Sequence, residues 1–137
     1  MTTAAPGFAW RARVHVDVAE PIEYGPDVGG MRRVVPIVGG EVAGEWVGQI
    51  LPGGADWQTV LDDGSVLISA RYPVRLIGVG DVVFDVRGAR SAIGTTSDFC
   101  TTLLIDGPAD SNLAKSVYAT VGRKSDAGVD YDLFEVT

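Results

Sequence analysis

The chain of 137 residues is 46% hydrophobic and 21% charged, which predicts one globular domain over residues 1–137 with a core of its own. Its net charge of −7, with lysine only at Lys115 and Lys124, argues against a nucleic-acid partner, because phosphate binding needs clustered cations. Cys100 is the single cysteine and His15 the single histidine, which excludes an intrachain disulfide and a zinc site of Cys and His ligands.

The N-terminal stretch MTTAAPGFAWRARV lacks the basic start and apolar run of a signal peptide. No segment approaches the roughly 18 consecutive apolar residues of a membrane span. We therefore expect a cytoplasmic protein with no membrane partner.

Residues 8–18 alternate between apolar and polar side chains, as a half-buried strand does. His15 lies on the polar face among charges, which favours a solvent-facing histidine over a catalytic base. The apolar face is expected to hold Phe8, Trp10, Ala12, Val14, Val16 and Val18.

The next segments read as a loop and two strands. Residues 20–30 are rich in turn residues, and residues 31–38 resume as a strand. Arg32 and Arg33 fall on opposite faces of that strand, so one of them is expected to point inward. Gly39-Gly40 is expected to end it, and residues 42–51 to form a third strand.

Residues 52–72, PGGADWQTVLDDGSVLISARY, predict a turn followed by a β-hairpin. The hairpin would fold on Asp62-Asp63-Gly64, because Asp before Gly is a strong hairpin signal. A regular pairing across that turn would bring four side chains to one end of the hairpin: Asp56, Trp57, Arg71 and Tyr72.

The second half continues with short strands between turns, at residues 82–87, 98–105, 117–121 and 129–136. Residues 88–97 read as a loop, and a short helix is expected near residues 111–116. This spacing predicts an all-β fold, a closed antiparallel β-barrel of about eight strands, because closure removes exposed edges.

Several runs resemble the family called domain of unknown function 3237. They are PIVGG at 36–40, LPGGADWQ at 51–58, DGS at 63–65, ARY at 70–72 and YDLFEV at 131–136. The resemblance covers the chain from about residue 8 to its end. It implies a small antiparallel β-barrel widespread in bacteria, and it implies no particular activity.

Two departures from the family pattern concern the expected pocket. Members typically carry Tyr-Phe-Arg-Thr where residues 98–101 read Asp-Phe-Cys-Thr, and Trp-Leu-Asn where residues 112–114 read Asn-Leu-Ala. If these positions line the pocket, Cys100 and Asn112 now shape it. Adaptation to a particular substrate and loss of an ancestral activity would both explain such a change.

Asp56 beside Trp57 is the strongest candidate for acid/base chemistry, because an apolar pocket disfavours the charged carboxylate and raises its pKa. The alternative is a carboxylate that accepts backbone N–H groups of the Gly-Gly turn. The two catalytic candidates are Asp56 and Arg71. Arg71 would hold a substrate oxygen with its planar guanidinium, or would form a structural ion pair.

The expected substrate-binding residues are Trp57, Tyr72, Arg33, Cys100 and Asn112. Trp57 and Tyr72 would form an aromatic wall. Cys100 lacks a nearby base or cation cluster, so an inert cysteine is favoured over a nucleophile. No cofactor is expected, and no metal site, because Asp62-Asp63 is more simply a turn than a cluster of converging oxygens.

Three function classes remain open. The first is a cofactor-independent enzyme with acid/base chemistry in a barrel pocket: an isomerase, a lyase (dehydratase) or an intramolecular cyclase. The second is a lipocalin-like binding protein for a small apolar or aromatic ligand. The third is a structural or homo-oligomer-forming protein with a filled barrel. The sequence leaves the substrate and the number of subunits open.

Overall fold

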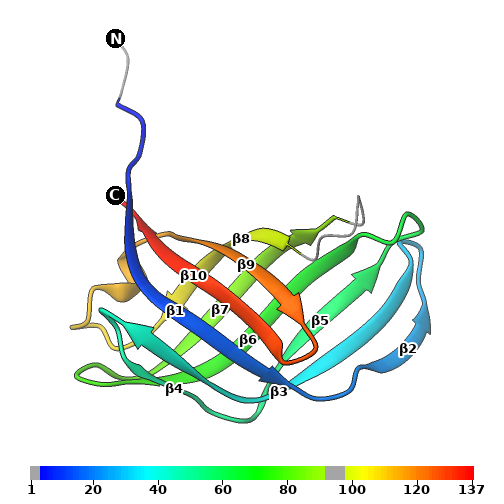
Figure 1. The fold of residues 1–137 in the computed structure, drawn as a ribbon, viewed down its shortest axis with the longest axis horizontal. Coiled ribbons are helices and arrows are strands. Elements are labelled where there is room, and N and C mark those ends of the chain that lie inside the picture. The colour runs from blue at the N-terminus through cyan, green and yellow to red at the C-terminus, as the bar shows by residue number, and fades with distance from the viewer. Residues whose placement is uncertain (1–3, 92–97) are drawn as a thin grey trace.

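The computed structural model describes residues 4–91 and 98–137, in which the alternating segments form ten antiparallel strands and one 3₁₀ turn (Figure 1). The strands are β1 (Phe8–Val18), β2 (Ile22–Pro26), β3 (Met31–Gly44), β4 (Gly48–Ile50), β5 (Gly54–Val60), β6 (Val66–Leu76), β7 (Gly80–Arg90), β8 (Asp98–Asp106), β9 (Tyr118–Ser125) and β10 (Gly128–Val136).

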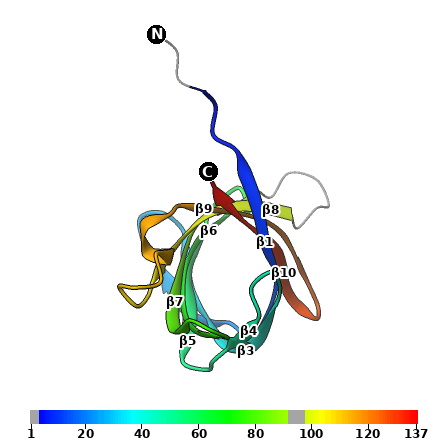
Figure 2. The same cartoon turned by 90° about the vertical axis from the view of Figure 1, so that its left-hand side faces the viewer.

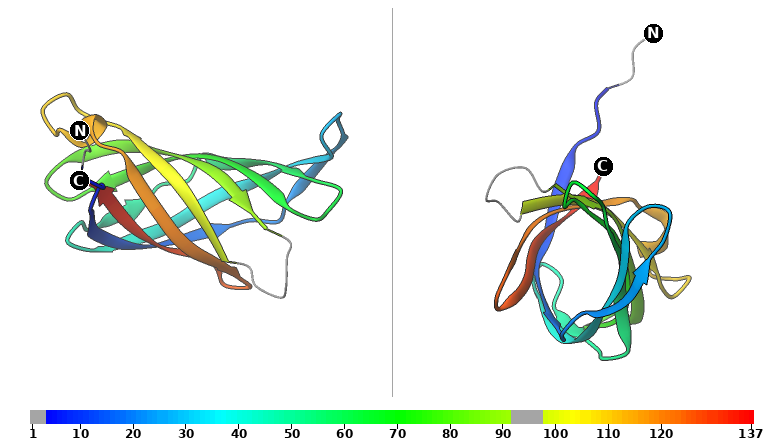
Figure 3. Two further views of the ribbon diagram at one scale, coloured as in Figure 1. Left: turned by 90° about the horizontal axis from the view of Figure 1, so that it is seen from above. Right: turned by 90° about the vertical axis from the view of Figure 1, so that its right-hand side faces the viewer.

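These strands close into an antiparallel barrel of eight positions, as the sequence predicts (Figures 2 and 3). Neighbours run in the order β1, β10, β9, β8, β7, β6, and β3 pairs with β1 to close the ring. β4 and β5 both lie between β6 and β3, and together they occupy one position of the ring. On the other side of β3, β1 pairs with one part of the strand and β2 with another.

The expectation that Gly39-Gly40 ends a strand is wrong, since β3 runs unbroken from Met31 to Gly44. Gly40 has a φ of 143°, and a Cβ there would lie 2.1 Å from the carbonyl oxygen of His15. The glycine therefore lets β3 pass close against β1 where the two strands pair, which is the use of glycine at a barrel bend.

Two further expectations about the first third are corrected. The segment 20–30, expected to be a loop, contains β2 at the edge of β3. Phe8 and Trp10 are exposed, because a bulge between Trp10 and Ala12 reverses which side chains face inward. Ala12, Val14 and Val16 are buried as expected.

The short helix is a single 3₁₀ turn, η1 (Leu113–Lys115), preceded by Asn112 in a left-handed conformation with φ 61°. β7 continues to Arg90, beyond the start of the loop expected at residues 88–97. Residues 92–97 of that loop lie outside the described residues, as do residues 1–3.

η1, the start of β1 and the end of β10 lie at one end of the barrel (Figure 1). This end is filled with buried side chains. Trp46 packs edge-on against Tyr118 with 5.5 Å between ring centroids, and the Tyr118 hydroxyl donates to the carbonyl oxygen of Leu113. The fully buried side chains around them include Phe84, Leu103, Leu133, Val14, Val42, Val74 and Val82.

Among the described residues, none belongs to a helix with the length and apolar character needed to cross a membrane.

Candidate functional site

The opposite end of the barrel encloses a cavity of about 70 Å³, large enough for several water molecules. Much of its wall is aliphatic, because inward positions of the strands carry Val16, Val18, Val35, Ile37, Ile68, Val86 and Val129. Its polar lining consists of Asp56, Gln58, Tyr72, Arg90, Thr101, Lys124 and Tyr131. An apolar chamber with a few placed polar groups is typical of a small-molecule site.

Asp56 is the one carboxylate that lines this cavity among the described residues. It lies on β5, where the even-numbered residues point into the barrel, and it accepts hydrogen bonds from Gln58 Nε2 at 2.6 Å and from the Ser69 backbone N–H at 3.0 Å. Burial raises the pKa of Asp56, although both hydrogen bonds and the charges of Arg90 and Arg33 oppose that rise. The carboxyl group is thus fixed in place and less acidic than in water.

Gln58 connects Asp56 to a cation. Its side chain is buried, and Arg33 Nε donates to Gln58 Oε1 at 2.7 Å while Gln58 Nε2 donates to Asp56. The amide is therefore oriented by both neighbours. Of the two arginines at the start of β3, Arg33 turns inward, and Arg32 stays exposed with Nε donating to the carbonyl oxygen of Gly25.

Tyr72 lies in the cavity wall, where its hydroxyl is hydrogen-bonded to the hydroxyl of Tyr131 on β10. Burial raises the pKa of both phenols, so both stay protonated at neutral pH. The tyrosines therefore offer neutral hydroxyl groups.

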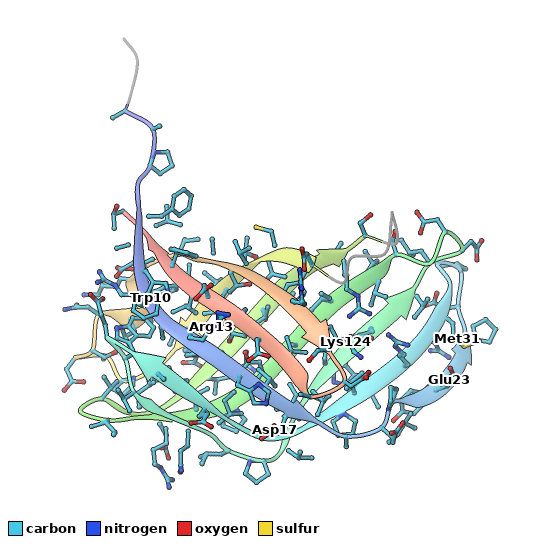
Figure 4. All side chains as sticks on the ribbon, viewed as in Figure 1. Trp10, Arg13, Asp17, Glu23, Met31 and Lys124 are labelled. Atoms are coloured by element: carbon cyan, nitrogen blue, oxygen red, sulfur yellow. The ribbon has the colours of Figure 1, made fainter. Side chains whose placement is uncertain are left out.

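A wider recess of about 510 Å³ adjoins the cavity at this end of the barrel. Four residues line both spaces: Val18, Val35, Arg90 and Lys124. Lys124 lies near the tip of the β9–β10 hairpin (Figure 4). Arg33 and the carboxylates of Asp17, Glu20 and Asp126 line the recess and do not line the cavity.

The expected pairing of Asp56 with Arg71 is wrong. Asp56 lies opposite Ala70, and Arg71 lies opposite Ala55, so the two side chains are on opposite faces of the sheet. The loop between β5 and β6 spans residues 61–65, so the two strands pair one residue out of the expected register. A shift of one residue moves each side chain of a strand to the other face of the sheet. Arg71 is on the outer wall, 57% exposed, and pairs with Asp85 and Asp106.

Trp57 is also outside the barrel, on the face of β5 opposite to Asp56. It is 59% exposed and stacks on Tyr24 of β2 with 5.9 Å between ring centroids. Of the expected aromatic wall, only Tyr72 faces the cavity.

Cys100 and Asn112 do not shape the cavity, contrary to expectation. Cys100 is exposed on β8, where Phe99 and Thr101 point inward in its place. Asn112 is exposed beside η1, at the filled end of the barrel. The two departures from the family pattern therefore lie outside this pocket.

Among the polar cavity residues missing from the expected set are Gln58, Arg90 and Tyr131. The alternation of apolar side chains could have found two of them. Gln58 is two residues from Asp56 on one strand, and Tyr131 has the same spacing from Leu133 and Val129. Arg90 falls in a segment expected to be a loop, so no sequence pattern placed it.

Within residues 4–91 and 98–137, no group of three or more His, Cys, Asp or Glu side chains is arranged to hold a metal ion.

Comparison with known proteins assigns a family to this barrel. A family model described as "Protein of unknown function (DUF3237)" matches residues 6–92. A UPF0311 protein of Clostridium acetobutylicum is 38% identical over 80 residues, covering 57% of this chain and 51% of that protein. The aligned part thus spans about half the length of this relative.

Solved structures show the same fold. A protein of unknown function from Clostridium acetobutylicum superposes with a TM-score of 0.89 at 22% identity, covering 99% of this chain and 100% of that one. An enzyme from Penicillium herquei superposes with a TM-score of 0.76 at 15% identity, covering 100% of this chain and 98% of that one. At these identities the likeness concerns the barrel alone.

Proposed function

Because this chain belongs to the DUF3237 family of proteins of unknown function, we propose a function from its own cavity: it is a cofactor-independent enzyme that uses Asp56 for acid/base chemistry on a small molecule. The observation that carries the proposal is a buried carboxyl group, held by two hydrogen bonds in a largely apolar chamber, with a raised pKa. Such tuning brings a carboxyl group closer to the working pH of a general acid or base.

The chemistry that fits is a proton moved from one atom of a bound substrate to another. The carboxylate of Asp56 would take a proton from the substrate, and the resulting carboxylic acid would return it to a different atom, so the enzyme ends unchanged. Isomerisation, elimination of water and intramolecular cyclisation can all proceed in this way. The Penicillium herquei enzyme supports the proposal only by giving one barrel of this shape in which catalysis occurs.

A second candidate is a binding protein for a small apolar or aromatic ligand. It is favoured by the largely aliphatic wall, in which the neutral Tyr72 and Tyr131 hydroxyl groups hydrogen-bond to each other and leave one O–H to orient a ligand. The third class, a filled barrel, predicted no cavity, and the described residues enclose one.

The proposal can be tested by hydrogen–deuterium exchange, with simple carbonyl compounds used in place of the natural substrate. The protein is incubated in D₂O with a panel of these compounds, and NMR follows replacement of C–H hydrogens by deuterium. Catalysed exchange by the wild type should be lost in Asp56→Asn and retained in Asp85→Asn, whose carboxyl group is on the outer wall. Equal exchange by Asp56→Asn would refute the role of Asp56. Ligand binding without exchange would favour the binding protein.

A further inference from the structure

Six of the eleven arginines and lysines of this acidic chain form ion pairs with described carboxylates, and five do not: Arg32, Arg33, Arg90, Lys115 and Lys124. On the outer wall, Arg71, Arg75, Arg87 and Arg123 each form an ion pair with an aspartate. At the open end of the barrel, no described carboxylate lies within ion-pairing distance of Arg33, Arg90 or Lys124. Three cations that pair with no described carboxylate have thus gathered at one site in a chain of net charge −7.

Their position relative to the cavity is specific. Arg90 and Lys124 stand with Val18 and Val35 at the junction between the cavity and the recess, so an apolar and a cationic surface meet there. Arg33 lines the recess beside them. The burial of Arg90 lowers the pKa of Arg90, and so does the repulsion between the guanidinium groups of Arg90 and Arg33. A bound anion would relieve this repulsion.

The acidic residues nearby do not supply that anion. Asp17, Glu20 and Asp126 line the recess, but none of them lines the cavity, and Asp17 is held by His15 at 2.9 Å. Asp56, in the cavity, attracts Arg90 and so raises the pKa of Arg90, but its oxygens accept from Gln58 and Ser69 and form no ion pair with Arg90.

We infer that the ligand of this cavity is an amphipathic organic anion, with its apolar body between the valines and its anionic group between Arg90 and Lys124. The inference names the substrate class of the proposed function and rests on that function only for the location of the site. A cavity of about 70 Å³ is smaller than the roughly 150 Å³ of an engineered cavity that binds benzene. The body is therefore no larger than one ring or a short branched chain, and it reaches into the junction.

Three ligands of similar shape test which charge the site prefers on its ligand: phenylacetate, phenylacetamide and phenethylamine. Each is titrated into isotope-labelled protein at neutral pH, and binding is followed by the backbone amide signals in NMR. Phenylacetate should bind about tenfold more tightly than the amide, the effect of one charge-assisted hydrogen bond, and added salt should weaken it. Equal affinity for acid and amide, tighter binding of the amine, or no binding by any of the three at millimolar concentration would overturn the inference.

Matched variants locate the anionic group. Arg90→Gln should remove most of the preference for the acid, and Arg87→Gln, three residues away on the outer face of β7, should keep it. Lys124→Gln, at an exposed position, repeats the test if Arg90→Gln is unfolded. Binding of phenylacetate should survive in Asp56→Asn, so loss of proton exchange in that variant leaves this inference standing. Retention of the preference in both cation variants would contradict it.

Discussion

Nε2 of Gln58 donates a hydrogen bond of 2.6 Å to Oδ2 of Asp56, and it does so because Arg33 occupies the oxygen of the same amide. This contact lowers the pKa of Asp56, in opposition to burial, which raises it. Gln58 therefore sets how acidic the proposed proton-transfer group is, although it does not itself transfer a proton.

Gln58→Leu removes this donor and replaces the amide with a shorter apolar side chain. The pKa of Asp56 should rise further, because burial then acts with less opposition. The titration of the Asp56 carboxyl carbon by NMR measures the change. Gln49→Leu, on the exposed side of β4, is the matched control and should leave the titration unchanged. An unchanged or lowered pKa in Gln58→Leu would contradict the role given to this amide.

Tyr72→Phe or Tyr131→Phe should each destabilise the fold by about 1–3 kcal/mol, because each leaves the partner hydroxyl buried without its hydrogen bond. The double variant should cost less than the sum of the two, since it leaves no orphaned hydroxyl. Urea unfolding of the four proteins in a double-mutant cycle measures this coupling. Strict additivity would mean that water replaces the lost partner in each single variant.

The sequence predicts the barrel well because its strands alternate over long stretches. In β6 the even-numbered residues are Val66, Ile68, Ala70, Tyr72, Val74 and Leu76, and they all face inward. This alternation turns Arg71 outward, whereas the expected pairing across Asp62-Asp63-Gly64 set it opposite Asp56 on the inner face. The local turn signal was weaker than the pattern of the whole strand, and register follows the buried face.

The site was less predictable than the fold, because its parts come from strands far apart in the sequence. Asp56 was identified from β5 alone, whereas Arg90 joins it through the pairing of β5, β6 and β7, and Tyr131 of β10 joins it only through closure of the ring. Cys100 attracted attention as a departure from a family pattern, and the register of β8 turns it outward. A departure from a family pattern says nothing about which side of a strand it occupies.

Gly40→Ala should destabilise the barrel by about 2–4 kcal/mol, because the added Cβ would lie 2.1 Å from the His15 carbonyl oxygen at a φ of 143°. Gly39→Ala is the matched control, since the nearest atom to its Cβ lies 3.8 Å away. Thermal unfolding of both variants measures the difference. Similar stabilities would show that β3 does not depend on this close approach to β1.

His15 lies on the outer wall between two carboxylates, with Nδ1 2.8 Å from Asp130 and Nε2 2.9 Å from Asp17. The hydrogen bond to Asp130 and the two charges raise the pKa of His15 above its usual 6.5. A group whose folded-state pKa is raised stabilises the fold below its unfolded pKa, and that contribution is lost as the pH rises through the folded-state value.

His15→Gln should therefore lower the free energy of unfolding more at about pH 5.5 than at about pH 9. The difference should be up to about 1 kcal/mol, because the pairs are partly exposed. Denaturant unfolding at the two pH values measures the difference. Arg13→Gln, two residues away and paired with Asp132, should show no such dependence, because arginine does not titrate in this range. An equal cost of His15→Gln at both pH values would contradict the raised pKa.

Asp56 should change stability with pH in the same direction as His15, as a cost at high pH, because burial raises the pKa of an acid by disfavouring its charged form. The folded state then holds its proton to higher pH than the unfolded state does. No cost exists below the unfolded pKa of about 3.8; the cost grows as the pH rises towards the folded-state value and is complete above it.

Asp56→Asn removes this titration, so the free energy of unfolding of the variant minus that of the wild type should increase as the pH rises above about 4. The test is how this difference changes with pH, and not its size at any one pH, because replacing one carboxyl oxygen by an amide group also disturbs the hydrogen bond from Gln58. Asp85→Asn, on the outer wall, lacks the buried position and should show no comparable rise. A flat difference for Asp56→Asn would mean that the pKa of Asp56 is not raised, and the cavity would lose its candidate acid.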